Sequence, residues 1–213
     1  MSDMHETIEK VVGDPIYTDV MLDLETLGTA PGSVILSIGA VAFGEGQPEA
    51  SWNLFEARPI KVQSCIDAGM TMGVTTLSWW LKQKQEACRL LDKALDATTP
   101  GMSLGEALYD FIDWFPEGAR LWGNGADFDN VLLGAAFKMC NFTPPWRYSN
   151  SRCYRTLKAI FKDTVPQPEF IGVKHDALAD ALHQTRHLQS ILLRMKNAEV
   201  VYKSACKSNP AEA

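Results

Sequence analysis

Hydrophobic positions follow two patterns along the chain, short apolar runs near the N-terminus and helical stripes further on. Apolar runs over 16–24, 33–43 and 51–57 are separated by turn segments at 28–32 and 44–48 that contain glycine and proline. Apolar runs of this length between such turn residues are typical of β-strands. Because both connections are short, we expect the three strands to form an antiparallel meander.

The rest of the chain has the spacing of amphipathic helices. Ser103 and Glu106 form a capping-box pattern, and the apolar residues that follow lie on one helical face. These residues predict a helix that begins at Ser103. The other expected elements are a short strand over 120–123 and helices over 77–95, 130–140, 154–162 and about 176–196.

The pattern also suggests where the folded domain begins and ends. Residues 1–15 are mostly polar and end in a Gly-Asp-Pro turn, so we expect a flexible N-terminal lead. The apolar pattern is lost from Asn197 onward, and residues 197–213 are expected to form a C-terminal tail. With no internal repeat and no low-complexity linker, the simplest prediction is a single α/β domain over residues 16–196.

Composition is that of an ordinary globular protein. Hydrophobic residues make up 46% of the 213 positions and charged residues 22%, which excludes a disordered chain. The formal net charge of −6 argues against a broad electrostatic surface for nucleic acid. It leaves room for a narrow site in which cations supply the positive charge, because a formal sum counts no bound ions.

Cysteine usage and hydropathy point to the cytoplasm. The five cysteines are scattered, odd in number and without a CxxC pair, which is typical of free thiols in a reducing compartment. The first ten residues lack the apolar segment of a secretory signal. The longest apolar run, over 34–43, is too short to span a membrane. We therefore expect a cytoplasmic protein without membrane contact.

Asp23 and Glu25 stand two positions apart at the end of the first predicted strand. Side chains at i and i+2 of a strand point to the same face, so both carboxylates leave an otherwise apolar strand together. Two adjacent like charges on a buried element are costly unless a cation lies between them. A metal site is one explanation, and a strand end that simply meets solvent is the other.

Two further segments carry acids to the start of helices. Asp127 and Asp129 follow the strand at 120–123, and acids there also serve as helix caps. Asp180 lies in the first turn of the last helix, at the margin of its apolar stripe, and His175 precedes that helix. Taken alone, a histidine just before a helix is usually a surface residue or a helix cap.

Taken in chain order, these segments resemble a known family. Asp23-x-Glu25-Thr26, Asn124-Gly-Ala-Asp-Phe-Asp129 and His175-x-Ala-x-x-Asp180 are similar to the three motifs of the DEDDh 3′–5′ exonucleases, which include polymerase proofreading subunits and oligoribonuclease. The resemblance runs from about residue 17 to about residue 193. Further segments are similar to phage-type exodeoxyribonucleases and to small bacterial exoribonucleases, namely 76–83, 122–125, 144–146 and 154–157.

The resemblance implies an α/β fold of the ribonuclease H-like type. In this fold, parallel strands extend the antiparallel meander into one mixed sheet, and helices flank that sheet. It also implies 3′–5′ hydrolysis of a nucleic acid with release of nucleoside 5′-monophosphates. Two divalent ions, Mg²⁺ or Mn²⁺, are the implied cofactors, and they suit carboxylate oxygens. The implied metal ligands are Asp23, Glu25, Asp129 and Asp180, and the implied general base is His175; Asp127 is not expected to bind metal.

Substrate contacts are expected around the acid pair. Thr26 and Leu27 match family positions that contact the terminal nucleotide, and Arg155 either grips a phosphate or forms a surface ion pair. Trp79 and Trp80 are candidates for stacking on bases. Adjacent helix positions lie about 100° apart, so the two rings cannot share one face, and at least one is expected in the core.

The nucleic acid is the least determined feature. Single-stranded DNA is favoured because the Trp-Trp and Pro-Pro-Trp segments resemble phage enzymes, and single-stranded RNA is the alternative. A non-catalytic nucleic-acid-binding module is the competing class, although all four acids and the histidine are present.

Two other features of the last helix allow different interpretations. His183 and His187 have the spacing of a zinc-protease helix, but Gln184 replaces the catalytic glutamate, and we expect the histidines to face solvent. Relatives are often dimers, and the apolar residues at 192, 193, 200 and 201 either form a homodimer surface or pack inward.

Overall fold

A five-stranded mixed sheet forms the centre of the computed structural model, which describes residues 16–125 and 127–208. The strand order is β3-β2-β1-β4-β5. The first three strands pair antiparallel, and β4 and β5 add to β1 in parallel. The predicted meander and mixed sheet are therefore confirmed. The strands are β1 Asp19–Thr26, β2 Ile35–Phe43, β3 Asn53–Ala57, β4 Arg120–Gly123 and β5 Ser151–Cys153.

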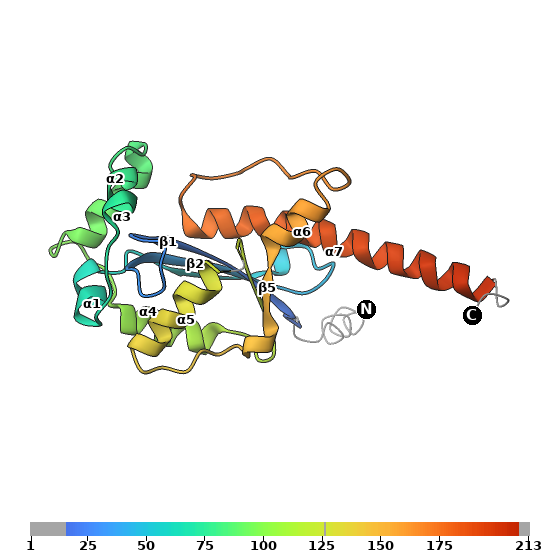
Figure 1. Cartoon of the computed structure of the whole chain (residues 1–213), viewed down its shortest axis with the longest axis horizontal. Helices are drawn as coiled ribbons and strands as arrows, with labels where there is room; N and C mark the ends of the chain where they lie inside the picture. Colours follow the sequence, from blue (N-terminus) through green and yellow to red (C-terminus); the bar gives the residue numbers. More distant parts are fainter. Residues whose placement is uncertain (1–15, 126, 209–213) are drawn as a thin grey trace, which may run out of the picture.

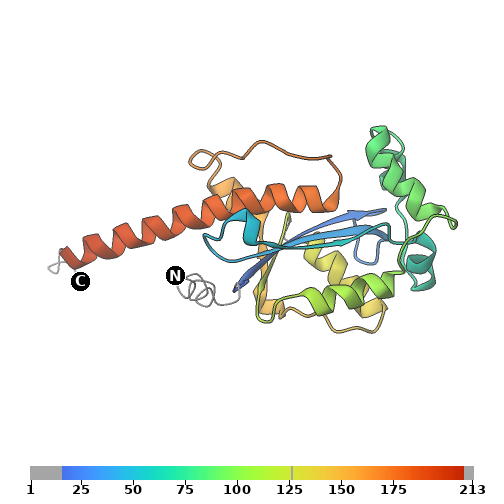
Figure 2. The same cartoon turned by 180° about the vertical axis from the view of Figure 1, so that it is seen from behind.

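Helices cover both faces of this sheet (Figure 1). The long helix α7 and the short α6 lie on one face, and α4 and α5 lie on the other, while α1, α2 and α3 gather at one end (Figure 2). No helix in the described part of the chain is both long and apolar enough to cross a membrane. The helices are α1 Val62–Asp67, α2 Val74–Trp80, α3 Gln85–Leu95, α4 Leu104–Trp114, α5 Asp129–Met139, α6 Tyr154–Ile160 and α7 Ala177–Ser208, with 3-10 turns at Glu49–Ser51 and Tyr148–Asn150.

Strand β1 divides the core into two apolar clusters. Val20, Leu22 and Leu24 belong to the cluster under α4 and α5, whereas Met21 belongs to the cluster under α6 and α7. Because strand side chains alternate between faces, Asp23 and Glu25 lie on the same side as Met21, toward α7. The two acids are thus directed to the face on which the last helix begins.

Two predicted boundaries are wrong. The helix expected over 77–95 is broken after Trp80, because the buried Trp80 indole donates a hydrogen bond to the Thr26 carbonyl (2.8 Å) while α3 packs on α1 and β2. The last helix, expected to end near Lys196, continues to Ser208. The C-terminal part of the helix extends away from the body of the protein (Figure 1), and Ile191 is the last buried residue of α7 that the structure describes, so this part needs no apolar stripe. The predicted lead over 1–15 lies outside the described residues.

The capping box is confirmed in detail. The Ser103 hydroxyl accepts from the Glu106 backbone N–H at 3.2 Å, and the Glu106 carboxylate accepts from the Ser103 backbone N–H at 2.7 Å. The strand β4 has the predicted bounds. The three-residue β5 and the six-residue α1 were not predicted, because elements this short carry too few positions for a periodic pattern.

Candidate active site

Gly39 allows the first turn of α7 to rest directly on the sheet. Gly39 pairs with Asp23 across β1 and β2. A Cβ atom at Gly39 would lie only 2.2 Å from the carbonyl carbon of Ala177, so no larger residue fits without displacing the helix. This close approach brings Asp180, in the first turn of α7, next to the end of β1.

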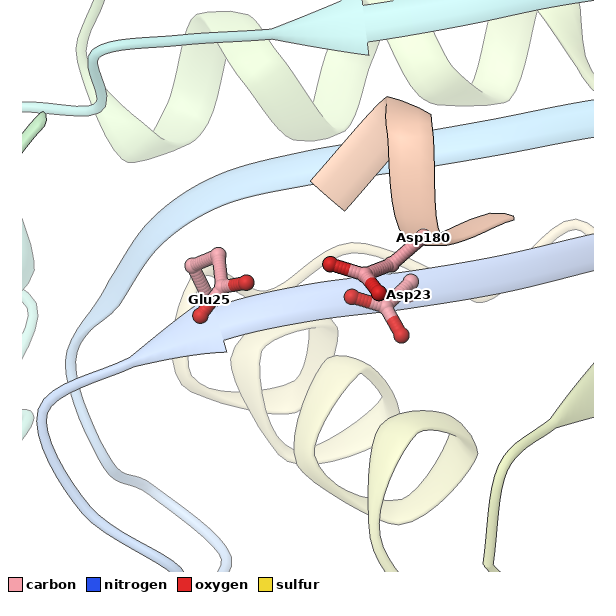
Figure 3. Close-up of side chains that lie close together, drawn as sticks. All are labelled: Asp23, Glu25 and Asp180. Carbon is pink, nitrogen blue, oxygen red and sulfur yellow. The ribbon is translucent and has the colours of Figure 1, made fainter. Parts of the chain in front are cut away.

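Three carboxylates meet at this point. Oxygen atoms of Asp23, Glu25 and Asp180 all lie within 4.8 Å of one another. Figure 3 shows the Asp23 and Asp180 carboxylates side by side, with Glu25 further along the strand. Glu25 is 8% exposed, and the other two are half-buried. Acids from segments far apart in sequence are therefore brought to one place.

The fourth predicted acid, Asp129, is not one of the three acids of this group. It is the first residue of α5 and is 2% exposed. Its two carboxylate oxygens accept hydrogen bonds from the backbone N–H groups of Leu24 (3.2 Å) and Asn124 (2.9 Å). These bonds tie the loop before α5 to β1, and the Asp129 charge still acts on Asp23, where it raises the pKa. Asp127 is exposed to solvent and is not one of the three acids of the group.

Burial raises the pKa of all four acids, and repulsion between them adds to this for Asp23 and Glu25. Burial, followed by the charges of Asp129, Glu25 and Asp180, raises the pKa of Asp23 well above its ordinary value. Burial and the Asp180 charge raise the pKa of Glu25 to about 8. Burial also raises the pKa of Asp129 to about 6 and that of Asp180 above its ordinary value. The protein alone therefore does not stabilise the charged forms at neutral pH.

A buried acid elsewhere in β1 shows the contrast. Asp19 is fully buried, but the Arg120 guanidinium donates to it at 2.7 and 2.6 Å and the Trp122 indole at 2.6 Å. No arginine or lysine of the described residues forms an ion pair with Asp23, Glu25 or Asp180. A crowded group of hard oxygen donors without a cationic side chain fits divalent ions such as Mg²⁺ or Mn²⁺.

His175 borders the acid cluster in a constrained conformation. Its φ of 64° lies in the left-handed region, which residues other than glycine adopt infrequently. Its backbone N–H donates to the Asp180 carboxylate at 3.0 Å, and its ring lies edge-on to the Trp79 ring with centroids 4.8 Å apart. Strained residues cluster at functional sites, and here two contacts hold the imidazole next to the acids.

A cavity of about 440 Å³ opens above the acids and the histidine. Its polar lining includes hydroxyl and amide groups, and its apolar lining consists of aromatic rings and one leucine. The lining residues are Asp23, Leu24, Glu25, Thr26, Thr29, Thr75, Thr76, Trp79, Trp80, Asn124, Phe128, His175, Asp180 and Gln184.

The predicted substrate contacts divide into those that reach this cavity and those that do not. Thr26, Trp79 and Trp80 line it. Trp79 is 41% exposed and Trp80 only 1%, which confirms that one of the two rings belongs to the core. Leu27 is fully buried in the core and does not line the cavity. Leu24, at 4% exposure, provides the apolar side chain there instead.

Arg155 lies next to the loop that leads into α5. A Cβ at Gly125 would lie 3.5 Å from the Arg155 guanidinium carbon, and the Arg155 charge lowers the pKa of Asp129 in opposition to burial. Arg155 is exposed and stands beside the cavity without lining it.

Sequence reasoning missed Gln184 and Asn124 as cavity residues. The Gln184 amide donates to the Asp23 carboxylate at 2.7 Å, and the signal for it was its position four residues after Asp180, one helical turn further on. The side-chain oxygens of Gln184 and Asn124 are buried and accept no hydrogen bond from the described residues. Unsatisfied oxygens next to three carboxylates add to the unbalanced negative character of the site.

The expectation that the histidine pair of α7 faces solvent is wrong. His187 is fully buried; its Nδ1 lies 2.8 Å from the Tyr154 hydroxyl and its Nε2 lies 3.1 Å from the Val165 carbonyl oxygen. With both ring nitrogens engaged in the core, His187 is not free to bind zinc. The protease interpretation therefore finds no support.

Comparisons with known proteins identify a family by its sequence model and a fold by a solved structure. The family model described as 3′-5′ exoribonuclease Rv2179c-like domain matches residues 18–192. No curated protein matches the chain. A solved structure described as the nuclease domain of 3′hExo, a DEDDh family member, bound to rAMP, is similar with a TM-score of 0.50 and 15% identity over 87% of this chain and 95% of that one. At this identity the likeness shows a shared fold.

Proposed function

The chain belongs to the family of 3′-5′ exoribonuclease Rv2179c-like domains, and on this premise we propose that it hydrolyses single-stranded RNA from the 3′ end and releases nucleoside 5′-monophosphates. The observation that carries the proposal is the convergence of Asp23, Glu25 and Asp180 beside His175 in one cavity. The DNA preference expected from the tryptophan and proline segments yields to the family description, which names RNA.

The acids are suited to hold the cofactor that this chemistry uses. Asp23, Glu25 and Asp180 would bind two divalent ions, and Asp129 would take part directly or through a water molecule. Such ions supply Lewis-acid activation of the phosphodiester and stabilise the leaving oxygen. The Gln184 amide orients Asp23, and the backbone bonds to Asp129 fix the strand end against α5.

The remaining residues perform proton transfer and positioning. His175 takes the proton from the attacking water, and its edge contact with Trp79 limits the motion of the ring. The exposed Trp79 provides a stacking surface for a terminal base, which works on single strands regardless of sequence. Trp80 and Thr26, which are joined by a hydrogen bond, line the same cavity next to Trp79.

A gel assay on single-stranded RNA and DNA of matched sequence, labelled at the 5′ end, tests the proposal. With Mg²⁺ or Mn²⁺ the wild type should shorten RNA from the 3′ end, and Asp23→Asn should lower the rate by at least about 100-fold. His175→Asn should also lose about 100-fold or more. His183→Asn is the matched control, since His183 does not line the cavity.

Each part of the proposal can fail separately. Equal binding of RNA by wild type and Asp23→Asn, without cleavage by either, would support the non-catalytic module. Faster cleavage of DNA than of RNA would retain the exonuclease and refute RNA as the preferred substrate. Full activity in the presence of a chelator would refute the divalent-ion site.

A further inference from the structure

A second cavity, of about 420 Å³, lies next to the acid cavity and has the opposite charge. Arg58, Arg89 and Lys93 line it, from the end of β3 and from α3. His175 lines both cavities, so the two are neighbours across a single side chain. Asp176 also lines the basic cavity, and its charge contributes to the raised pKa of Glu25, which places it close to the acid cluster.

Two of the three cations in this cavity have no acidic partner among the side chains that the structure describes. Arg58 forms ion pairs with Asp176 and with Glu56, the latter at 2.9 Å. No carboxylate whose side chain the structure describes forms an ion pair with Arg89 or Lys93. In a chain with a net charge of −6, two unpaired cations in one cavity favour an anionic ligand.

The floor of the cavity holds an unpaired buried donor. Ser37 lines the cavity, is 1% exposed, and its hydroxyl has no hydrogen-bond partner among the described residues. A buried hydroxyl left without a partner costs free energy, so such groups in native proteins usually meet a ligand or a water molecule. Ser37 pairs with Glu25 across β2 and β1, which puts this donor one strand away from the acid cluster.

We propose that this cavity binds a phosphate group of the substrate strand upstream of the bond that is cleaved. The proposal rests on the nuclease function, since a strand whose 3′ end occupies the acid cavity would pass His175 to reach Arg89 and Lys93. The arginine fork and the lysine ammonium are both phosphate-binding groups, and the Ser37 hydroxyl is a third donor. The released 5′-monophosphate has the same chemistry and is the competing source of the phosphate.

The test compares two double variants that remove the same types of side chain. Arg89→Ala/Lys93→Ala removes the unpaired cations, and Arg194→Ala/Lys138→Ala removes one exposed arginine and one exposed lysine that line neither cavity. kcat/KM is measured on a ribodinucleotide and on a decaribonucleotide with the same 3′ end. The dinucleotide contains only the bond to be cleaved, so it lacks an upstream phosphate.

Removal of the cavity cations should lower kcat/KM on the decamer by about 10-fold or more, because charge-assisted hydrogen bonds to phosphate are strong. The dinucleotide rate and both rates of the control variant should stay within about twofold. The slope of log Kd against log salt for the decamer should fall by about 0.7 for each phosphate that the variant no longer binds. Ser37→Ala should show a smaller decrease, also confined to the decamer.

Other outcomes would overturn the inference. Equal decreases on both substrates, or no decrease on either, exclude an upstream phosphate site. Weaker inhibition by nucleoside 5′-monophosphate in Arg89→Ala/Lys93→Ala, with no length effect, assigns the cavity to the product. If the wild type cleaves neither RNA, the proposed function fails and fluorescence anisotropy of the labelled decamer decides: weaker binding by the cavity variant than by the control supports the phosphate site, and equal binding refutes it.

Discussion

At the scale of single residues, burial and hydrogen bonding distinguish the side chains assigned to the site from those that stabilise the fold. Trp79 and Trp80 are neighbours in sequence, but one ring is 41% exposed over the cavity and the other is 1% exposed with its N–H bonded to Thr26. Asp23 and Asp19 share one strand, but only Asp19 has cationic and indole donors. The unbalanced acids and the exposed ring are therefore the residues assigned to chemistry.

The stability of the metal-free protein should fall as the pH rises. Burial raises the pKa of Glu25 from 4.5 to about 8, so folding favours its protonated form. That contribution is complete below the unfolded pKa and is lost as the pH rises through the folded pKa. Between about pH 5 and pH 8, the melting temperature in the presence of a chelator should drop by about 5 °C or more.

Divalent ions should oppose this drop, because they bind the carboxylate form. Thermal melts with Mg²⁺ or Mn²⁺ should show stabilisation that increases with pH, and Glu25→Gln should flatten the pH dependence in chelator. If neither Mg²⁺ nor Mn²⁺ changed the melting temperature at any pH, the shared metal site would be contradicted.

Replacement of the two tryptophans should have different effects. Trp79→Ala should weaken binding of single-stranded RNA by about 1–3 kcal/mol, the value of one stacking contact, with little change in melting temperature. Trp80→Ala should destabilise the fold by about 3–5 kcal/mol, because it leaves a cavity in the core. Urea unfolding and fluorescence anisotropy measure the two effects, and the opposite assignment would place the stacking surface on Trp80.

At the scale of elements, the site depends on how closely α7 approaches β1 and β2. The helix contributes Asp180 and Gln184, and the Asp180 carboxylate in its first turn positions His175. Gly39 is the contact point, where a single added carbon would meet the helix backbone. The break between α2 and α3 also shapes the site, because it allows Trp79 and Trp80 at the end of α2 to border the cavity.

Gly39→Ala should therefore lower activity by moving α7. The added methyl group forces a backbone shift that should cost about 1–3 kcal/mol and separate Asp180 from Asp23. Stabilisation by Mg²⁺ or Mn²⁺ should decrease together with kcat. Gly134→Ala, in the interior of α5 with open space around it, is the matched control and should be neutral or stabilising by about 0.5–1 kcal/mol. Normal activity in Gly39→Ala would show that the contact is not needed.

At the scale of the whole molecule, two apolar clusters hold helices on the two faces of one sheet. The three-acid group lies where the end of the central strand β1 meets the first turn of α7. The extension of α7 beyond this body carries an ion pair between Glu199 and Lys203 one turn apart (2.5 Å). A homodimer remains a prediction: Leu193 is exposed, whereas Leu192 packs against the cluster under α7.

Deletion of residues 197–213 tests the predicted limit of the domain. The truncated protein should keep kcat/KM within about twofold and its melting temperature within about 2–4 °C, because the buried part of α7 ends at Ile191. Sedimentation of the full-length and truncated chains shows whether the extension joins two copies. Failure of the truncated chain to fold would show that the domain includes the extension.

The sequence alone determined the features that follow from local pattern. Apolar runs joined by short turns predicted the meander, the capping box predicted the start of α4, and the motif order predicted the family and fold. The sequence also predicted the four acids and the histidine as one set, because the types of these residues and their order along the chain can be read without a structure.

Only the tertiary structure decided which side chains share a space. The end of α2, the burial of Leu27 and His187, and the role of Gln184 depend on contacts between residues far apart in the chain. The basic cavity joins Ser37, Arg58 and Arg89, which share no motif. Local pattern records the preference of a segment for helix, strand or burial, whereas distances between segments are set by packing, and it is packing that brings charges together.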